Sequence, residues 1–301
     1  MTLTIENAAG YGNWQNPELF PDIFSGHVLY NLQKAAVADE ITNTEFEGQI
    51  QGGASTVKII KAPVVSVDTN VGKGAKLNLQ NVDADAITML VDQNVSCAFV
   101  VDSISQALSN IDLLNMTIKE AVYRVRDAYD SNIFTYIEAQ ATALTGQTIG
   151  FGASDTDPIN IFNIARENLD LANVPYEDCY AVVSPTVIKY LMAADSKLLN
   201  VNEMGYSSKS PIITPAVPRF NVAGMDVYVS NNVTRTGTTS SVALFGHKSA
   251  VSTAKALLES SVQDRGENGF GKFYKSLLVY GRQVLRSEAL FKMTVTNGTL
   301  G

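Results

Sequence analysis

The feature that most constrains this chain is a segment of 28 residues, Thr117–Leu144, in which apolar side chains recur at helical spacing. Thr117 and Glu120 match the capping-box pattern that begins a helix, and Gly146 is a natural helix end. At 1.5 Å per residue, the predicted helix is about 42 Å long. A compact core in a chain of 301 residues does not require such a length. We therefore expect a helix that extends beyond a compact core.

The N-terminal segment has the composition of an extended arm. Residues 1–50 contain seven acidic residues and one basic residue, Lys34, and glycines and prolines interrupt them. Helical spacing appears only at Gly26–Ile41. Because Trp14 and Phe20 are large aromatic residues in a loose segment, we expect them to be buried against the body or against a neighbouring chain.

A second projection is predicted between residues 49 and 80. Its β-branched stretches, Thr56–Ile60 and Val64–Val67, lie on either side of Pro63 and indicate a long β-hairpin. This hairpin has too few apolar residues to bury itself, so it needs another surface. It carries a net charge of +3, because one aspartate, Asp68, is opposed by four lysines. These are Lys58, Lys61, Lys73 and Lys76.

The remaining segments predict short strands and helices. Ile87–Val91 and Ser96–Val101 are expected to be strands joined by a tight turn at Asp92–Asn94. Asp157 is the expected cap of the first helix after the long one. Helices are predicted at Ile159–Asn173, Ser184–Ala194 and Ser249–Leu258, and strands at Tyr180–Val183, Val222–Ser230, Val242–Phe245, Phe273–Leu285 and Glu288–Val295. This alternation implies a small α/β layer structure.

Composition excludes some classes of function. The chain has 22 basic and 30 acidic residues and a pI near 4.8, whereas a general nucleic-acid binder is usually basic. No segment is as long and apolar as a membrane-spanning helix, so we expect no membrane contact. The two cysteines, Cys97 and Cys179, stand far apart without a pairing motif, which predicts buried structural thiols.

The chemical patterns in the sequence are incomplete. Gly266–Lys272 has the glycine and lysine spacing of a phosphate-binding loop, but Phe273 replaces the required hydroxyl residue and a strand is expected to follow. The only histidines, His27 and His247, have no metal-ligand or triad partners at a recognised spacing. We therefore predict no catalytic residue, no cofactor-binding residue and no metal site, and the chain is not expected to be an enzyme.

Several stretches follow one another in a recognisable order. They are Ile41–Gly48 with Thr56–Ile59, Ser96–Asp102, Ala165–Pro175, Tyr180–Val187 and Phe220–Asn231. Together with the long helix, they resemble the major capsid proteins of tailed bacteriophages, which have the Hong Kong 97-type fold. The long helix takes the place of that family's spine helix, and Asp130 stands at a position that is often acidic there. The resemblance runs from about Asp39 to Val295.

The resemblance implies an α+β fold with an N-terminal arm, an extended β-hairpin loop, a peripheral domain with a long spine helix, and an α/β axial domain. The implied ranges are 1–43 for the arm and first helix, 44–80 for the extended loop, 81–157 with 262–301 for the peripheral domain, and 158–261 for the axial domain.

The resemblance also implies a shell subunit that forms pentamers and hexamers and encloses double-stranded DNA without sequence-specific binding. The shell would be a virion head assembled in the host cytoplasm. No long segment precedes the arm, which within the family implies a separate scaffolding protein; a portal and a decoration protein are further implied partners. The two projections point to assembly, so we expect inter-subunit contacts at six residues. These are Trp14, Phe20, Lys58, Lys61, Lys73 and Lys76.

Two other functions are compatible with the sequence. An encapsulin-type cellular compartment shares the capsid fold, and its shell holds cargo enzymes rather than a genome. A soluble nucleotide hydrolase would use Gly266–Lys272 as its phosphate-binding loop.

Overall fold

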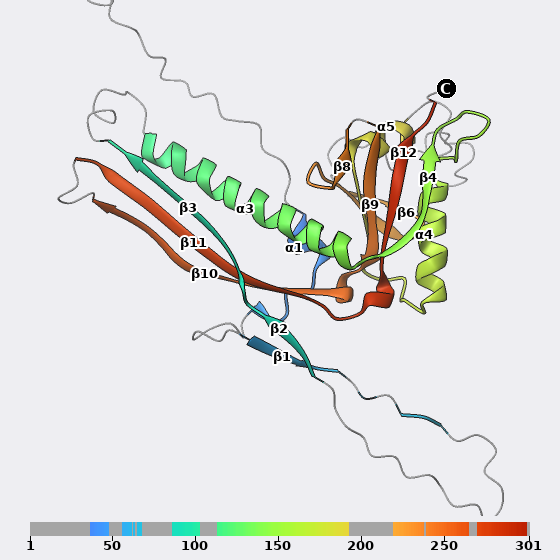
Figure 1. Ribbon diagram of the computed structural model, residues 1–301, viewed down its shortest axis with the longest axis horizontal. Coiled ribbons are helices and arrows are strands. Elements are labelled where there is room, and N and C mark those ends of the chain that lie inside the picture. Colours follow the sequence, from blue (N-terminus) through green and yellow to red (C-terminus); the bar gives the residue numbers. More distant parts are fainter. Residues whose placement is uncertain are drawn as a thin grey trace, which may run out of the picture.

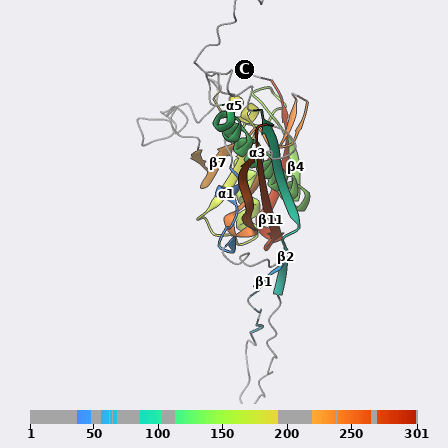
Figure 2. The ribbon, with the colours of Figure 1, turned by 90° about the vertical axis from the view of Figure 1, so that its left-hand side faces the viewer.

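The computed structural model describes residues 37–47, 56–61, 63, 65–67, 86–102, 113–192, 219–237, 239–264 and 270–299. A long helix, α3, lies along a three-stranded antiparallel sheet, and a seven-stranded sheet lies at the C-terminal end of this helix (Figure 1). The body is narrow when it is viewed from the side, and the β1–β2 hairpin projects from it (Figure 2).

Helix α3 (Leu113–Gln140) has 28 residues, as predicted, but both of its ends lie four residues earlier than expected. Its C-terminal half is the most buried part: Ile133 and Ile137 have no exposed surface, and Tyr129 is 5% exposed. It is the longest of the helices in the described ranges.

The predicted limits of this helix are wrong for local reasons. Thr117 lies inside the helix and does not cap it. Beyond Ala141, residues Thr142–Ile149 form strand β4, which pairs in parallel with β12 (Leu290–Asn297). The β-branched threonines of this stretch favour a strand, and pairing with β12 outweighs the apolar spacing that suggested helix.

The three-stranded sheet has the order β10-β11-β3. Its strands are β3 (Gln93–Val101), β10 (Val251–Asp264) and β11 (Lys272–Val284). Helix α3 packs on it where Tyr129 meets Tyr280 edge-on, with ring centroids 4.9 Å apart. The helix predicted at 249–258 is wrong, because Val251 and Thr253 belong to a strand that pairs with β11 on both sides of a register shift between Leu257 and Glu259.

The hairpin is made of strands that are distant in sequence. Strand β1 (Thr56–Ile60) pairs with β2 (Ala86–Leu90) and not with the predicted partner at 64–67. Strands β2 and β3 do not pair with each other, so the predicted turn at Asp92–Asn94 is wrong: the chain passes from the hairpin directly into the three-stranded sheet (Figure 1). The second strand of the hairpin thus ends at Leu90, beyond the expected limit at residue 80.

The seven-stranded sheet has the order β4-β12-β9-β5-β7-β6, with β8 paired to β9. Its further strands are β5 (Cys179–Val183), β6 (Arg219–Val222), β7 (Met225–Val229), β8 (Arg235–Thr236) and β9 (Ser240–His247). The single strand predicted at 222–230 is wrong, because Ala223 and Gly224 adopt positive φ angles of 52° and 74° and turn the chain between β6 and β7.

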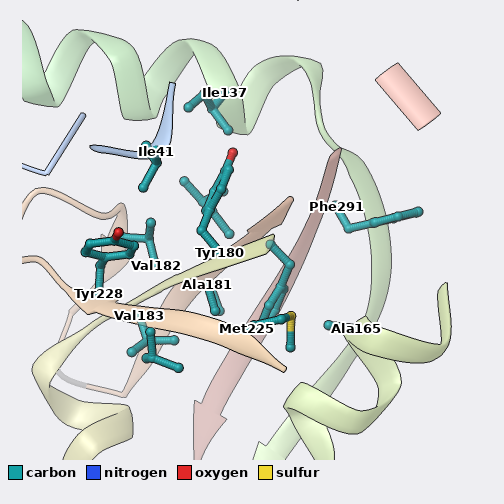
Figure 3. Close-up of a cluster of buried hydrophobic side chains, with 14 of the residues drawn as sticks. Ile41, Ile137, Ala165, Tyr180, Ala181, Val182, Val183, Met225, Tyr228 and Phe291 are labelled. Atoms are coloured by element: carbon teal, nitrogen blue, oxygen red, sulfur yellow. The ribbon is translucent and has the colours of Figure 1, made fainter. Parts of the chain in front are cut away.

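Both faces of this sheet are covered. Figure 3 shows Tyr180 pointing toward Ile137 of α3 and Ile41, whereas Met225 lies on the side of Ala165 from α4. The helices here are α4 (Asn160–Leu171) and α5 (Pro185–Leu191). The predicted Asp157 cap is wrong: Asp157 accepts a hydrogen bond from the N–H of Ile159 at 3.1 Å, but Ile159 itself is the N-cap residue of α4 and no side chain caps the helix.

Sheet membership differs from the expected domain ranges at three strands. Strand β10 belongs to the three-stranded sheet, although most of it falls in the expected axial range of 158–261. Strands β4 and β12 belong to the seven-stranded sheet, although both fall in the expected peripheral ranges. The chain crosses between the two sheets more often than the sequence pattern indicates.

We predict that Ile133→Asp destabilises the subunit strongly, because it places a carboxylate without a partner at a position with no exposed surface. The expected loss in the free energy of unfolding is about 3–5 kcal/mol, measured by urea denaturation. Ser131→Asp on the exposed side of the same helix is the control and is expected to change little. Equal urea midpoints for the two variants would contradict this account of the core.

Candidate assembly surfaces

The residues 37–47, called the junction segment here, attach both predicted projections to the body. The segment contains the short helix α1 (Ala38–Ile41). Asn43 lies beside Ser252 in a parallel bridge: its N–H donates to Val251 O at 2.9 Å, and its carbonyl accepts from the Thr253 N–H at 2.9 Å. The junction segment is thereby added to the edge of β10.

Asp130 of α3 holds the other end of the junction segment. Its side chain is completely buried, and its Oδ1 accepts hydrogen bonds from the backbone N–H groups of Val37 at 2.9 Å and Ala38 at 2.7 Å. Its Oδ2 accepts from Asn232 Nδ2 at 3.0 Å. Burial raises the pKa of the Asp130 carboxyl above its ordinary value, and the three N–H donors oppose that rise.

A charged group lies at the outer side of the junction segment. Lys255 Nζ of β10 is 2.5 Å from Asp39 Oδ2 and 3.6 Å from Glu47 Oε1, and it lies 5.6 Å from the ring centroid of Tyr129. The Asp39 side chain is 53% exposed, so solvent weakens this ion pair. We therefore expect this charged group to orient the junction segment and to contribute little to the free energy of unfolding.

The hairpin is buried only at its root. Val57 and Met89 form a small buried cluster with Ala254 of β10, and Phe46 of the junction segment packs against it. The opposite face is open to solvent: Ile60 is 75% exposed and Leu90 is 53% exposed. A two-stranded hairpin of this kind is marginal on its own, so its open face is a candidate contact surface.

Of the six residues predicted as contacts, the structure describes two. Lys58 and Lys61 are both exposed, Lys58 on the open side of β1 and Lys61 just beyond its end. Trp14, Phe20, Lys73 and Lys76 lie outside the described residues.

Exposed apolar residues also lie at the far end of the three-stranded sheet, where Val262 and Val100 point to opposite faces. Phe270 is 84% exposed beside the start of β11, and Val100 of β3 and Val262 of β10 are 53% and 44% exposed. Sequence reasoning missed this group, as it missed Ile60 and Leu90. A signal was present in the order Gly-Phe-Gly at 269–271, since an aromatic residue between two glycines in a turn has little local cover.

The described residues contain no gathered chemical site. No group of three or more His, Cys, Asp or Glu side chains among them could hold a metal ion. The Gly266–Lys272 pattern leads into strand β11 and not into a helix, which is the wrong context for a phosphate-binding loop; its residues 266–269 lie outside the described ranges. No helix in the described part of the chain is long and apolar enough to cross a membrane.

Cys179 belongs to a packed structural group. Its Sγ accepts from Arg166 Nη1 at 3.2 Å and lies 3.0 Å from the Pro175 carbonyl. The Arg166 guanidinium also pairs with Asp170 and lies 3.7 Å from the ring centroid of Tyr176. Burial raises the pKa of the Cys179 thiol, which agrees with the predicted buried structural thiol, whereas Cys97 is only partly buried.

No protein-family model and no curated protein matches this chain. Solved structures resemble it over nearly its whole length. A structure from Mycobacterium phage Che8 has a TM-score of 0.77 and 22% identity, covering 91% of this chain and 96% of that one. The capsid of cyanophage P-SCSP1u has a TM-score of 0.70 and 17% identity, and the match covers 94% of each chain. The mature capsid of bacteriophage PhiM1 has a TM-score of 0.67 and 18% identity, and the match covers 93% of each chain.

These likenesses agree with the elements described above. The long helix along a three-stranded sheet, the second sheet with α4 and α5, and the projecting hairpin together confirm the α+β architecture that the resemblance implied. All three structures come from phages, so the encapsulin-type alternative is not favoured. The chain therefore has the Hong Kong 97-type fold expected from its sequence, the fold of bacteriophage capsid proteins.

Proposed function

We propose that this chain is the major capsid protein of a tailed bacteriophage, which assembles through pentamers and hexamers into an icosahedral head around double-stranded DNA. The observation that carries this proposal is the match to three phage structures, two of them described as capsids, over more than nine-tenths of this chain and of each matched chain. A shell role also explains why so much of the hairpin lies outside the core of its own subunit.

Physical properties of the exposed surfaces support the same function. Ile60 on the hairpin and Phe270 at the end of the three-stranded sheet expose apolar area that an isolated subunit does not cover. Burying that area against neighbours is favourable by roughly 25 cal/mol per Å². Because a closed shell repeats each contact on every subunit, individually weak contacts add up.

The finer parts of the function follow from this assignment. The seven-stranded sheet would form the axial domain, and α3 with the three-stranded sheet the peripheral domain. The candidate inter-subunit contacts remain Trp14, Phe20, Lys58, Lys61, Lys73 and Lys76. A separate scaffolding protein, a portal and a decoration protein are the proposed partners, in a virion assembled in the host cytoplasm. The net charge of −8 suits a wall that encloses DNA without binding its sequence.

Electron microscopy and native mass spectrometry of the purified chain test the proposal. We expect shells, tubes, or pentamers and hexamers that form as the protein concentration rises. A chain that stays monomeric at all concentrations, with or without a scaffolding protein, would show that the capsid fold serves another purpose here. Particles isolated from the native source should contain DNA; cargo enzyme inside them would favour the encapsulin-type alternative.

We predict that combining Lys58→Glu with Lys61→Glu weakens shells but leaves the subunit folded. Residues 49–80 carry a net charge of +3, so the rest of the chain carries −11, and a basic hairpin is attracted to a neighbour's acidic body. Each exposed pair contributes only about 0.2–1 kcal/mol, so the effect depends on repetition. Shell melting against ionic strength is the measurement, with the greatest loss expected at low salt, where repulsion is unscreened.

The matched control is Lys58→Arg with Lys61→Arg, which keeps both positive charges. It should melt like the parent shell at every ionic strength. If the glutamate variant also melts like the parent at every salt concentration, packing alone holds the hairpin and the electrostatic explanation is wrong.

A further inference from the structure

Asp130 lies where three parts of the chain meet. It belongs to α3, it binds the backbone of Val37 and Ala38 in the junction segment, and it binds Asn232 in the connection between β7 and β8. The first two contacts join residues 93 and 92 positions apart, and the third joins residues 102 apart. One carboxylate therefore fixes three segments that local sequence does not bring together.

The chemistry of these contacts is unusual for a buried acid. Asp130 has no exposed surface, yet none of its hydrogen-bond donors among the described residues is a cation. Removing an ionised carboxylate from water is unfavourable unless its oxygens accept enough hydrogen bonds. Replacing Asp130 would therefore leave the N–H groups of Val37 and Ala38 buried without their acceptor.

Two further carboxylates near Asp130 have partners of their own, and one of these partners is shared with Asp130. Asp127, one turn earlier on α3, shares the Asn232 amide, whose Nδ2 donates to Asp127 Oδ1 at 2.8 Å. On the side of α1, Asp39 is paired with Lys255 of β10. The Asp130 carboxylate thus depends on neutral N–H groups for its hydrogen bonds.

The hydrogen bonds from Val37 and Ala38 to Asp130 matter because of where these two residues lie in the sequence. Residues before Val37 form the predicted arm, and residues after Glu47 lead to the hairpin. The hairpin end of the junction segment is held separately, by the bridge between Asn43 and Ser252 and by the 2.8 Å contact between the hydroxyls of Thr42 and Thr253. Asp130 is thus the attachment point at the arm end.

We propose that Asp130 is a latch that fixes where the N-terminal arm leaves the subunit and ties this exit point, through Asn232, to the seven-stranded sheet. The arm can then reach its neighbour only from one position on the body. The effect of the latch on shells rests on the proposed capsid function, whereas its effect on the isolated subunit does not.

Hydrogen exchange on the unassembled full-length subunit tests the latch directly. With Asp130→Ala, we expect the amides of residues 37–41 to exchange at least ten times faster than in the parent. Peptides from the β9–β12 pair should stay unchanged, because that pair lies elsewhere in the core. Unchanged exchange at 37–41 would overturn the proposal.

Two further variants make the result specific. Asp127→Asn alters the other carboxylate that binds Asn232 but leaves the contacts to Val37 and Ala38 in place, so exchange at 37–41 should match the parent. If Asp130→Ala does not fold, Asp130→Asn provides the test: its amide puts an N–H donor against the existing donors, so exchange should again rise near Val37 or near Asn232. Parent-like exchange at both places in a folded Asp130→Asn would overturn the latch.

Electron microscopy of assembled particles tests the consequence for shells. We expect the parent to form regular shells and Asp130→Ala to form open or irregular ones. Regular shells from a variant with fast exchange at 37–41 would overturn the claim that the latch directs the arm. If the parent itself forms no particles, the proposed function fails, while the exchange experiment still decides whether Asp130 holds the junction segment.

Discussion

The simultaneous packing of helix α3 against two different sheets is the constraint on which the rest of the structure depends. Tyr129 meets Tyr280 of the three-stranded sheet, while Ile137 faces Tyr180 of the seven-stranded sheet (Figure 3). The buried side chains of the helix and both sheets form one continuous cluster. Separating the sheets would expose much of that cluster to water, so the described body is held as one unit.

Burial on the hairpin differs between its two faces. Ile41 of the junction segment is completely buried within the main cluster, and Val57 at the root of the hairpin is 4% exposed. Ile60, on the opposite face of β1, is 75% exposed. That open face makes few contacts within its own subunit, so another chain can cover it at little cost in lost internal packing.

Sequence reasoning succeeded where local pattern and tertiary context agree, as for the length of α3 and for strand β5. It failed where partners distant in sequence decide the structure. Residues 251–258 have apolar spacing that suits a helix, but they lie beside β11, and hydrogen bonding along that strand makes them β10. Strands β1 and β2 pair although about 25 residues separate them, so no local sequence pattern predicts that they are partners. Asp130 was visible only as an acidic position; its partners Val37, Ala38 and Asn232 come from the fold.

The distribution of exposed apolar residues determines what kind of assembly this subunit can form. Ile60 and Leu90 lie on the hairpin, whereas Phe270, Val100 and Val262 lie where β10, β11 and β3 end, at another extremity of the body (Figure 1). The two groups consist of different residues on different elements, so each needs a complementary surface elsewhere on a neighbouring copy. Contacts of this heterologous kind do not close after two subunits; they continue into rings or larger assemblies. An elongated body with different contact surfaces at separate extremities is thus suited to a shell, in which each subunit touches several neighbours.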